Sequence, residues 1–302
     1  MAINADVLVP GNYFCDLVFT GFPAFPALGT EVYTQGLTVT VGGVLNTVVA
    51  LQRLGVNVGW LGALGNDFFS RYVAEVLQAE GVTLDGAQRL PTPLQRVTAA
   101  VSYPHDRAFI TYVDETPNVV DLLLSALEGG SDFRHLHFSR LMTDERLPAL
   151  MRAWRDAGKT ISMDCQHRQE TLASPIVREV LSLVDWFMPN ASEALRVANV
   201  HSLEEAVTVL RPHVRGLLIK DGGNGAHVWH GESAHHAPAL PLTPIDTTGA
   251  GDVFNAGFIK AWRDGLPLPA CLRYGNVCGG LSTQGYGGAV NAPTLAQVLA
   301  CL

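Results

Sequence analysis

The sequence has no long apolar run. No stretch approaches the ~18 consecutive uncharged apolar residues that a transmembrane helix needs. The first residues, MAINADVLVPGNYF, also lack the basic segment followed by an apolar run that marks a secretory signal peptide. We therefore expect no membrane partner and a location in the cytoplasm.

Cysteine is sparse and scattered. None of the five cysteines belongs to a C-x-x-C pair; they are Cys15, Cys165, Cys271, Cys278 and Cys301. This spacing argues against a zinc site or a disulfide framework, and it suits a reducing compartment. Each thiol is expected to be a small apolar core residue.

Charged residues are also few. They make up 16% of the chain, and 20 Lys and Arg against 28 Asp and Glu give a net charge of −8. Nucleic acids and anionic membranes are both bound by clustered cations, so neither is expected as a partner. What the sequence has in quantity is apolar residues, 48% of 302, which is enough for a sizeable core.

Short apolar segments alternate with helix-like segments. The strand-like segments are residues 6–11, 57–65, 135–139, 160–164, 186–190 and 216–222. The helix-like segments 47–55, 71–81 and 146–158 each end in glycine, a common helix stop. Alternation of this kind predicts a mainly parallel sheet that helices cover on both faces.

Two segments have a period of two residues instead. Residues 30–41 alternate threonines with apolar side chains, and residues 96–113 resemble two strands around a Pro-His-Asp turn. We expect antiparallel strands with one wetter face, forming a small β lid from about 13–40 and 95–115 on a single domain of residues 1–302. Such a lid excludes water from a reacting group. Its strands either pair across a homodimer or cap their own site.

The strongest local signal is PIDTTGAGDVF at residues 244–254. A helical pattern follows Asp252, so Gly249, Ala250 and Gly251 are expected in the turn that opens a helix. Free N–H groups at a helix start attract anions. A carboxylate beside such an anion site is suited to take the proton of an attacking hydroxyl. The alternative is that Asp252 only caps the helix.

The run Asp246–Asp252 resembles the signature of the ribokinase-like, or PfkB, carbohydrate kinases. The resemblance implies a three-layer α/β/α fold with a mainly parallel sheet and a small β lid. It also implies ATP-dependent phosphorylation of a primary hydroxyl on a small sugar or sugar acid. Asp252 would be the general base, and the N–H groups of Gly249, Ala250 and Gly251 would stabilise the charge of the phosphoryl group.

Other segments resemble the family in its order along nearly the whole chain. Asp16 resembles the aspartate that binds substrate hydroxyls, a role that suits a group accepting two hydrogen bonds. Residues 41–46, VGGVLN, resemble the Gly-Gly-x-x-Asn acceptor segment, which makes Gly42, Gly43 and Asn46 substrate-binding candidates. For Asp16 the alternative is a turn residue, and for Asn46 it is an ordinary helix cap.

Three further segments imply a nucleotide site. Asn190 and Glu193 resemble the N-x-x-E motif that organises Mg²⁺ through water; the alternative is a capping box, and the two roles can coexist. Lys220 stands where the family has threonine; it either reaches a phosphate or is exposed. The remaining nucleotide-binding candidates implied by the resemblance are Gly222, Gly225 and Asn276.

The resemblance also implies a monovalent cation, K⁺, in the loop after the last core helix. Its candidate ligands are Asp246, Thr248, Ser282, Gly287 and Asn291.

The identity of the substrate that accepts the phosphoryl group is the part of the function that the sequence determines least. Residues 163–168, MDCQHR, resemble the D-x-N-x-R stretch of fructokinases and 2-keto-3-deoxygluconate kinases, with Gln166 in place of Asn. Arg168 would hold a substrate carboxylate, or else form a salt bridge. A nucleoside acceptor and a non-catalytic sensor remain open. A dinucleotide-dependent dehydrogenase is excluded, because no G-x-G-x-x-G follows the first strand.

Overall fold

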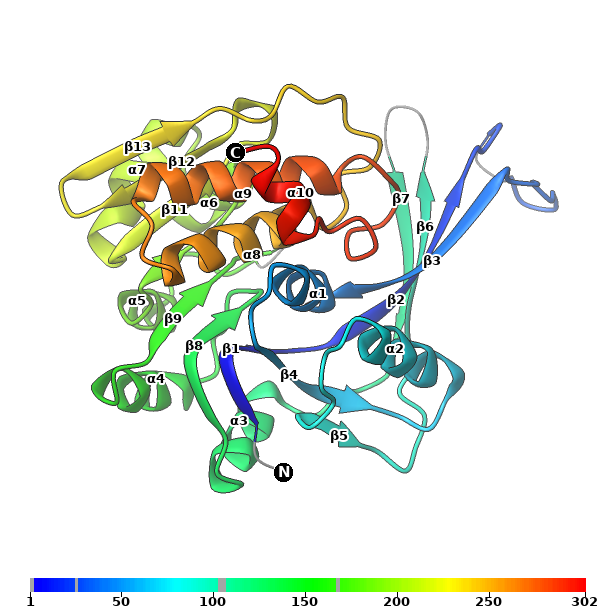
Figure 1. The fold of residues 1–302 in the computed structure, drawn as a ribbon, viewed down its shortest axis with the longest axis horizontal. Coiled ribbons are helices and arrows are strands. Elements are labelled where there is room, and N and C mark those ends of the chain that lie inside the picture. The colour runs from blue at the N-terminus through cyan, green and yellow to red at the C-terminus, as the bar shows by residue number, and fades with distance from the viewer. Residues whose placement is uncertain (1–2, 25–26, 103–106, 167–168) are drawn as a thin grey trace.

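The larger of two sheets forms the centre of the molecule (Figure 1). The computed structural model describes residues 3–24, 27–102, 107–166 and 169–302. The strand order is β13-β12-β11-β10-β9-β8-β1-β4-β5. All neighbours from β11 to β5 are parallel, and β12 and β13 form an antiparallel edge. The strands are β1 (Asn4–Pro10), β4 (Val58–Leu64), β5 (Ala87–Arg89), β8 (Asp132–Phe138), β9 (Thr160–Met163), β10 (Trp186–Phe187), β11 (Gly216–Lys220), β12 (Ala226–His230) and β13 (Ser233–Ala237).

Helices cover both faces of this sheet, and each face has its own apolar core. One core holds residues of α1 (Leu45–Arg53), α2 (Phe68–Ala79), α8 (Ala250–Arg263), α9 (Leu268–Ser282) and α10 (Leu295–Leu299). The other holds residues of α3 (Val119–Glu128), α4 (Leu147–Asp156), α5 (Pro175–Ser182), α6 (Ala191–Ala198) and α7 (Leu203–Leu210). The predicted α/β/α layers are therefore confirmed. None of the helices in the described ranges is long and apolar enough to cross a membrane.

Consecutive side chains of a strand point to opposite faces, and β1 shows this directly. Val7 and Val9 belong to the first core, whereas Leu8 belongs to the second. A strand segment that is buried on both faces is apolar, which is why β4 and the buried part of β1, residues 7–10, read as continuous apolar runs in the sequence.

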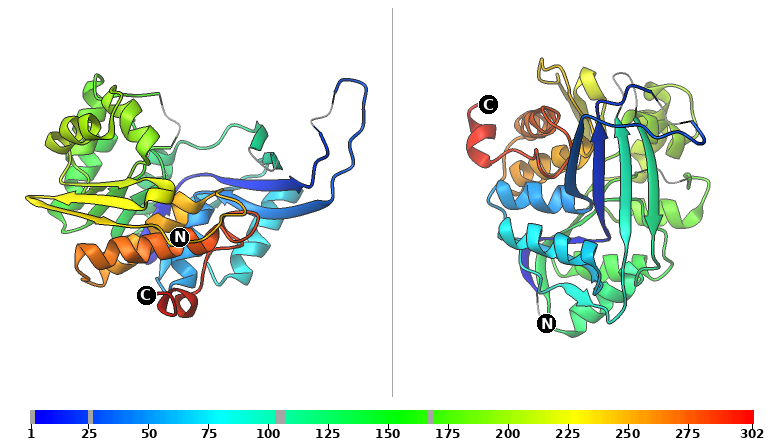
Figure 2. Two further views of the ribbon diagram at one scale, coloured as in Figure 1. Left: turned by 90° about the horizontal axis from the view of Figure 1, so that it is seen from above. Right: turned by 90° about the vertical axis from the view of Figure 1, so that its right-hand side faces the viewer.

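A second sheet of four strands forms the lid, in the order β3-β2-β6-β7. These strands are β2 (Tyr13–Thr20), β3 (Gly36–Gly43), β6 (Arg96–Ser102) and β7 (Arg107–Val113). Figure 2 shows them side by side, extending away from the helical layers. The expectation of purely antiparallel pairing is wrong for the central pair, because β2 and β6 run parallel. β2 and β6 are each the first strand of an insertion into the large sheet. Both insertions leave that sheet in the same direction, so their first strands run parallel.

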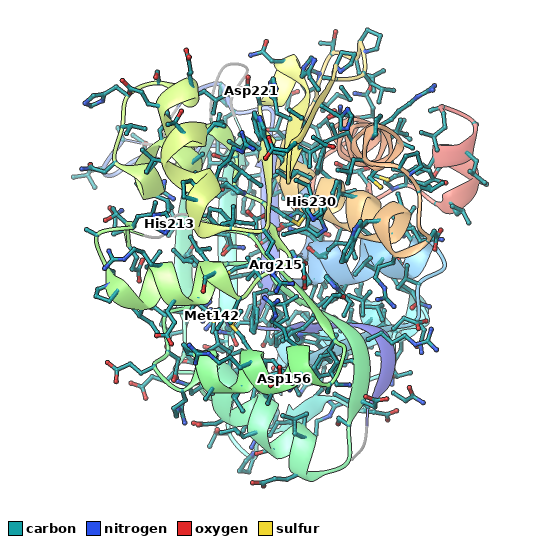
Figure 3. All side chains as sticks on the ribbon, turned by 90° about the vertical axis from the view of Figure 1, so that its left-hand side faces the viewer. Met142, Asp156, His213, Arg215, Asp221 and His230 are labelled. Carbon is teal, nitrogen blue, oxygen red and sulfur yellow. The ribbon has the colours of Figure 1, made fainter. Side chains whose placement is uncertain are left out.

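The carboxyl ends of the parallel strands position the site. Arg215 and Asp221, which flank β11, mark the two ends of this strand in Figure 3. Ligands of open parallel sheets bind beyond the carboxyl ends of the strands. At that edge Asp164 follows β9, Asn190 lies three residues after β10, and Lys220 ends β11.

Candidate active site

Helix α8 begins with a turn that only glycine fits. Gly249 is the N-cap residue with φ 71°, and a Cβ at this position would lie 2.8 Å from Asn46 Nδ2 and 2.9 Å from the Cα of Gly288. The helix starts at Ala250, earlier than its apolar pattern indicated, so Asp252 lies in the first turn. Gly249, Gly251 and Asp252 line one cavity of about 530 Å³. The Ala250 N–H instead donates to the Thr247 carbonyl at 3.3 Å.

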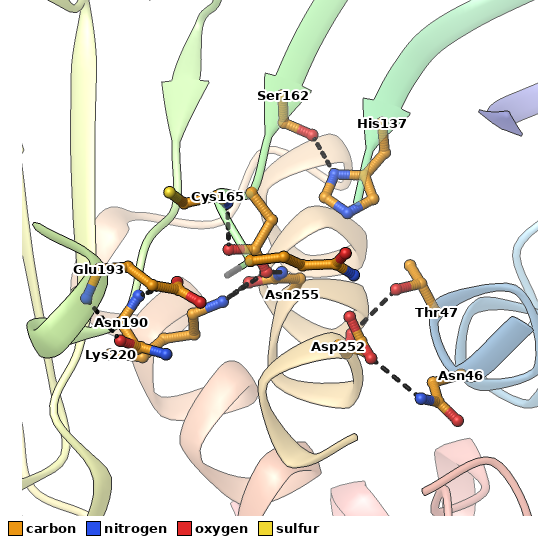
Figure 4. Close-up of polar contacts among 12 residues, drawn as sticks. Asn46, Thr47, His137, Ser162, Cys165, Asn190, Glu193, Lys220, Asp252 and Asn255 are labelled. Atoms are coloured by element: carbon orange, nitrogen blue, oxygen red, sulfur yellow. Dashed lines mark hydrogen bonds and ion pairs between the residues drawn. The ribbon is translucent and has the colours of Figure 1, made fainter. Parts of the chain in front are cut away.

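The side chain of Asp252 is held by a residue of α1. Asn46 Nδ2 donates to Asp252 Oδ2 at 3.0 Å (Figure 4). The N-cap of α1 is Val44, whose side chain makes no cap hydrogen bond, so the alternative that Asn46 is an ordinary cap is wrong. Burial and the charge of Asp164 raise the pKa of Asp252 to about 7, although the Asn46 hydrogen bond and the charge of Lys220 oppose this rise. The carboxyl group is therefore balanced between its two protonation states near neutral pH.

Lys220 lies inside the protein rather than on its surface. The residue is only 9% exposed, so the alternative of an exposed lysine is wrong. Lys220 Nζ lies 2.7 Å from Asp164 Oδ2 and 3.2 Å from Asn255 Oδ1 (Figure 4). Asn255 Nδ2 donates to the same Asp164 oxygen at 2.6 Å. These side chains join the end of β11 to the end of β9 and to α8.

Asn190 and Glu193 do form the capping box that the sequence allowed. The Asn190 side chain accepts from the Glu193 N–H, and Glu193 Oε2 accepts from the Asn190 N–H at 2.9 Å. Both residues also line the 530 Å³ cavity. Burial raises the pKa of Glu193, and the charge of Asp164 adds to this rise. Two carboxylates that share a cavity wall favour a bound cation.

Asp16 lies in the lid sheet within a row of polar side chains. Thr40 and Thr98 are its register partners on β3 and β6, and the hydroxyl of Thr111 lies 3.2 Å from that of Thr98. Burial raises the pKa of Asp16 to about 6; the hydrogen bond of Thr98 opposes this rise. A Cβ at position 42 would lie 2.0 Å from Asp16 Oδ2, so only glycine lets β3 approach this carboxylate.

A second, more apolar cavity of about 230 Å³ adjoins the first. Lys220, Gly222 and Gly251 line both cavities, so the two are continuous along the end of β11. Asn276 lines the second cavity and donates to the carbonyls of Ala237 and Pro238, which fixes the loop after β13. Gly225 lies in its wall too, with φ 92°. The predicted nucleotide residues thus meet around one cleft.

The candidate cation ligands converge on Asp246. Its carboxylate accepts from the N–H and hydroxyl of Thr248 and from the N–H of Gly287. Asn291 Nδ2 donates to the Gly287 carbonyl at 2.8 Å. Ser282 ends α9, one residue before the Thr283 carbonyl that accepts from the Asp246 N–H.

Comparison with known proteins identifies the family. Residues 20–295 match the family model described as pfkB family carbohydrate kinase. The chain belongs to this family of carbohydrate kinases. It is 26% identical to the ribokinase of Bacillus subtilis over 294 residues, which is 97% of this chain and 98% of that protein. It is 28% identical to a cytidine kinase of Thermococcus kodakarensis, over 86% and 93% of the two chains. The structure of an Arabidopsis thaliana ribokinase with ribose and ATP matches with a TM-score of 0.82 at 22% identity, covering 100% of this chain and 99% of that one.

The activity of this pfkB kinase is accordingly ATP-dependent phosphorylation of a sugar or sugar acid. Its site also contains residues to which the sequence analysis gave no role. Asn255 lies three positions after Asp252, on the same side of α8, and helical spacing could have found it. Asp164 stood inside a recognised motif, whereas nothing in the sequence pointed to Arg140, which lines the 530 Å³ cavity. Arg168 lies outside the described residues.

Proposed function

We propose that this kinase transfers the γ-phosphoryl group of ATP to a primary hydroxyl of a small sugar or sugar acid, with Asp252 as the general base. The single observation that carries this is the placement of Asp252. Its carboxyl group lies in the first turn of α8, in the wall of the cavity that Gly249 and Gly251 also line, with its pKa raised to about 7. A base with a pKa near the working pH is efficient at proton transfer.

The acceptor would lie between the lid and α1. Asp16, with its pKa raised to about 6, would accept hydrogen bonds from sugar hydroxyls. Gly42 and Gly43 would let the sugar approach the β3 backbone. The Oδ1 of Asn46 is buried with no hydrogen-bond partner in the described part of the chain, so a hydroxyl of the acceptor would satisfy it.

The nucleotide would occupy the cleft that runs from the 230 Å³ cavity to the 530 Å³ cavity. Its base would lie among apolar side chains near Asn276, and its phosphates would pass Gly222 and Gly225 toward α8. Lys220 lines both cavities and would neutralise phosphate charge along this path. The amides of Gly249 and Gly251 would stabilise the charge of the transferring group, as hydrogen-bond donors at a helix start do.

Mg²⁺ fits this arrangement. Within the described residues no group of three or more His, Cys, Asp or Glu could hold a metal by itself. A metal that keeps most of its waters and binds phosphate oxygens needs only one or two carboxylates, and Glu193 near Asp164 supplies them. When bound, Mg²⁺ supplies positive charge that offsets the phosphate charge. We further propose K⁺ beside Asp246; equal activity in sodium and in potassium salts would contradict this part.

A nucleoside acceptor is the second candidate, because one relative is named a cytidine kinase. A non-catalytic sensor of the same fold is the third, although a sensor has no need of a base at position 252. A coupled ADP-release assay over pentoses, hexoses, keto-acids and nucleosides tests all three. Turnover with a sugar or sugar acid supports the proposal, turnover with nucleosides alone replaces it, and no turnover favours the sensor.

We also propose a cytoplasmic location and a homodimer that forms through the lid. All five cysteines are free, which fits a reducing compartment. The lid carries exposed apolar side chains that a second copy would cover, and the alternative is that the lid only caps its own site. The 302 residues carry a net charge of −8, and we propose no nucleic-acid partner.

A further inference from the structure

The chain between α9 and α10 packs directly on the side chain that holds Asp252. A Cβ at Gly288 would lie 2.8 Å from Asn46 Oδ1 and 2.9 Å from the Cα of Gly249. Asn46 Nδ2 donates to Asp252, whereas Asn46 Oδ1 has no hydrogen-bond partner among the described residues (Figure 4). Packing against Gly288, rather than a second hydrogen bond, therefore orients the amide group of Asn46.

This α9–α10 segment, residues 283–294, forms neither helix nor strand. The Gly287 N–H donates to Asp246 Oδ2 at 2.9 Å, and Asn291 Nδ2 donates to the Gly287 carbonyl at 2.8 Å. These bonds hold the backbone at residue 287. Because neither a helix nor a strand continues through the segment, the backbone after Gly288 depends on side chains from other elements for its hydrogen bonds.

Arg53, the last residue of α1, supplies these hydrogen bonds. Its Nη1 donates to the Val290 carbonyl at 3.0 Å and to the Ala292 carbonyl at 2.6 Å. Its Nε and Nη2 donate to the two carboxylate oxygens of Glu80, the C-cap residue of α2, at 2.9 and 2.6 Å. The pair with Glu80 thus joins α1 to α2, and the two carbonyl contacts join α1 to the α9–α10 segment.

Helix α1 therefore acts on the site from both of its ends. Asn46 lies in its first turn and Arg53 is seven residues later, a rise of ~10 Å along the helix. Ala289 and Ala292 also pack in the apolar core of this face. Apolar contact is non-directional, whereas hydrogen bonds to the carbonyls define how the backbone is oriented. The guanidinium of Arg53 thus determines the course of the segment that contacts Asn46.

We propose that Arg53 is a positioning residue of the reaction: through the carbonyls of residues 290 and 292 it holds Gly288 against Asn46, and so maintains the hydrogen bond that Asn46 donates to Asp252. Arg53 lines neither the 530 Å³ cavity nor the 230 Å³ cavity, so it acts on the base without touching a substrate. The guanidinium stays charged at every pH at which the enzyme works. This inference rests on the proposed function, because it needs Asp252 as the base.

The pH profile of kcat/KM for the sugar provides the test. Arg53→Met removes both carbonyl contacts, and the bond from Asn46 should then weaken. That bond lowers the pKa of Asp252, so its loss should move the inflection of the profile upward by about one pH unit, the size of a lost charge-assisted hydrogen bond. At pH 7 kcat/KM should fall ~5-fold, with KM for ATP unchanged. The other groups that act on this pKa lie on other elements and stay in place: Asp164, Glu193 and Lys220.

Three further variants separate positioning from charge and from stability. Arg53→Lys keeps the charge but not the fork of donors, so a smaller upward shift in this variant comes from lost contacts alone. Glu80→Gln removes the ion pair and leaves the carbonyl contacts, and it should keep the wild-type inflection. Arg155→Met is the matched control, because Arg155 also lies in the last turn of a helix, α4, and donates to a carbonyl, that of Leu183 at 3.0 Å. It should lower the urea midpoint without shifting the inflection.

The outcomes separate this inference from the proposed function. Gly288→Ala disturbs the same contact from the other side and should also move the inflection upward. If Arg53→Met is less stable but keeps the wild-type inflection, Arg53 is only structural and the inference is wrong, while the sugar kinase stands. If Arg53→Met does not fold, an unshifted inflection in Arg53→Lys overturns the inference. If the wild type phosphorylates no sugar, the proposed function fails, and the inference fails with it.

Discussion

The proposed mechanism depends on a single carboxyl group, that of Asp252, whose environment resists ionisation. The pKa of Asp252 is raised from 3.8 to about 7 by burial and by Asp164. A general base acts only when deprotonated, so kcat/KM should rise tenfold per pH unit below about pH 7 and level off above it. Initial rates from pH 5 to 9 at subsaturating sugar measure this. A profile that is flat between pH 5 and 8 would contradict the assignment.

Replacement of the same carboxyl group by an amide should separate activity from stability. Asp252→Asn should lower kcat by ~10³-fold, in the range of general-base loss, and leave ATP affinity nearly unchanged. Asp264→Asn, at the other end of α8, is the control and should keep normal kcat. The measurements are steady-state kinetics and ATP titration. A mutant that keeps a tenth of the activity would remove Asp252 from this role.

The raised pKa of Asp252 also determines whether replacing its carboxyl group makes the protein more or less stable. Folded Asp252 keeps its proton up to about pH 7, whereas the unfolded group loses it near 3.8. The unfolded state thus binds fewer protons between these values, and the contribution of this group to stability falls as pH rises. Asp252→Asn should therefore be more stable than wild type at pH 8, on the order of 4 kcal/mol, and the difference should shrink toward pH 4. Urea unfolding at the two pH values measures it.

The buried pair of Lys220 and Asp164 supports a further prediction at this scale. Removal of one partner leaves a buried charge unpaired, so Lys220→Met should lower the free energy of unfolding by ~3–5 kcal/mol. The double variant Lys220→Met with Asp164→Asn should recover most of that loss, because it removes both charges. Its kcat should stay low if Lys220 also serves the phosphates. Full activity in the double variant would restrict the pair to a structural role.

At the scale of elements, the start of α8 needs glycine for two separate reasons. The positive φ of Gly249 is unfavourable for any residue with a Cβ. A Cβ at this position would also clash with atoms of Asn46 and Gly288. Gly55 has a similar φ of 78° with nothing within 4 Å of such a Cβ. Gly55→Ala should cost only the backbone strain, ~1 kcal/mol, and keep kcat. Gly249→Ala should displace Asn46 and reduce kcat by ~10²-fold or more, the size of losing an oxyanion donor. Equal effects of the two would contradict this view.

The elements were predictable from the sequence where local pattern decides them. The apolar runs located β1, β4 and β11, and the glycine stops located the ends of α1, α2 and α4 within a few residues. The parallel pairing of β2 with β6 was not predictable, because it depends on where two distant insertions leave the large sheet. Alternation of apolar and polar residues shows which face of a strand is exposed to solvent. It carries no information on whether the neighbouring strand runs parallel or antiparallel.

At the scale of the whole molecule, the same limit applies to the site. Asp252 and its glycines are contiguous, so their grouping could be predicted from the sequence. Lys220 is 56 residues from Asp164, and Asn255 is 91 residues from it. Only the order of strands in the sheet brings these groups together. A buried lysine and an exposed one look the same in a sequence, which is why both alternatives for Lys220 stayed open there.

The proposed homodimer would form through the lid. Val39, Leu17, Ala99 and Ile110 are register partners across its four strands, on the face opposite Asp16. Val39 is 38% exposed and Ile110 is 67% exposed. Contiguous exposed apolar residues of this kind are typical of an interface, and a partner lid would remove them from water. Light scattering at ~50 μM should then give twice the chain mass of 32.4 kDa.

Ile110→Asp should return the protein to the mass of a single chain, because a carboxylate at the centre of an apolar contact would be buried without a partner. Leu299→Asp is the matched control: this leucine is 56% exposed on α10, outside the lid, and its replacement should leave the mass unchanged. A monomeric wild type would contradict the homodimer and favour a lid that serves only its own site. Since Asp16 belongs to the same sheet, a true dimer contact should also make KM for the sugar depend on protein concentration.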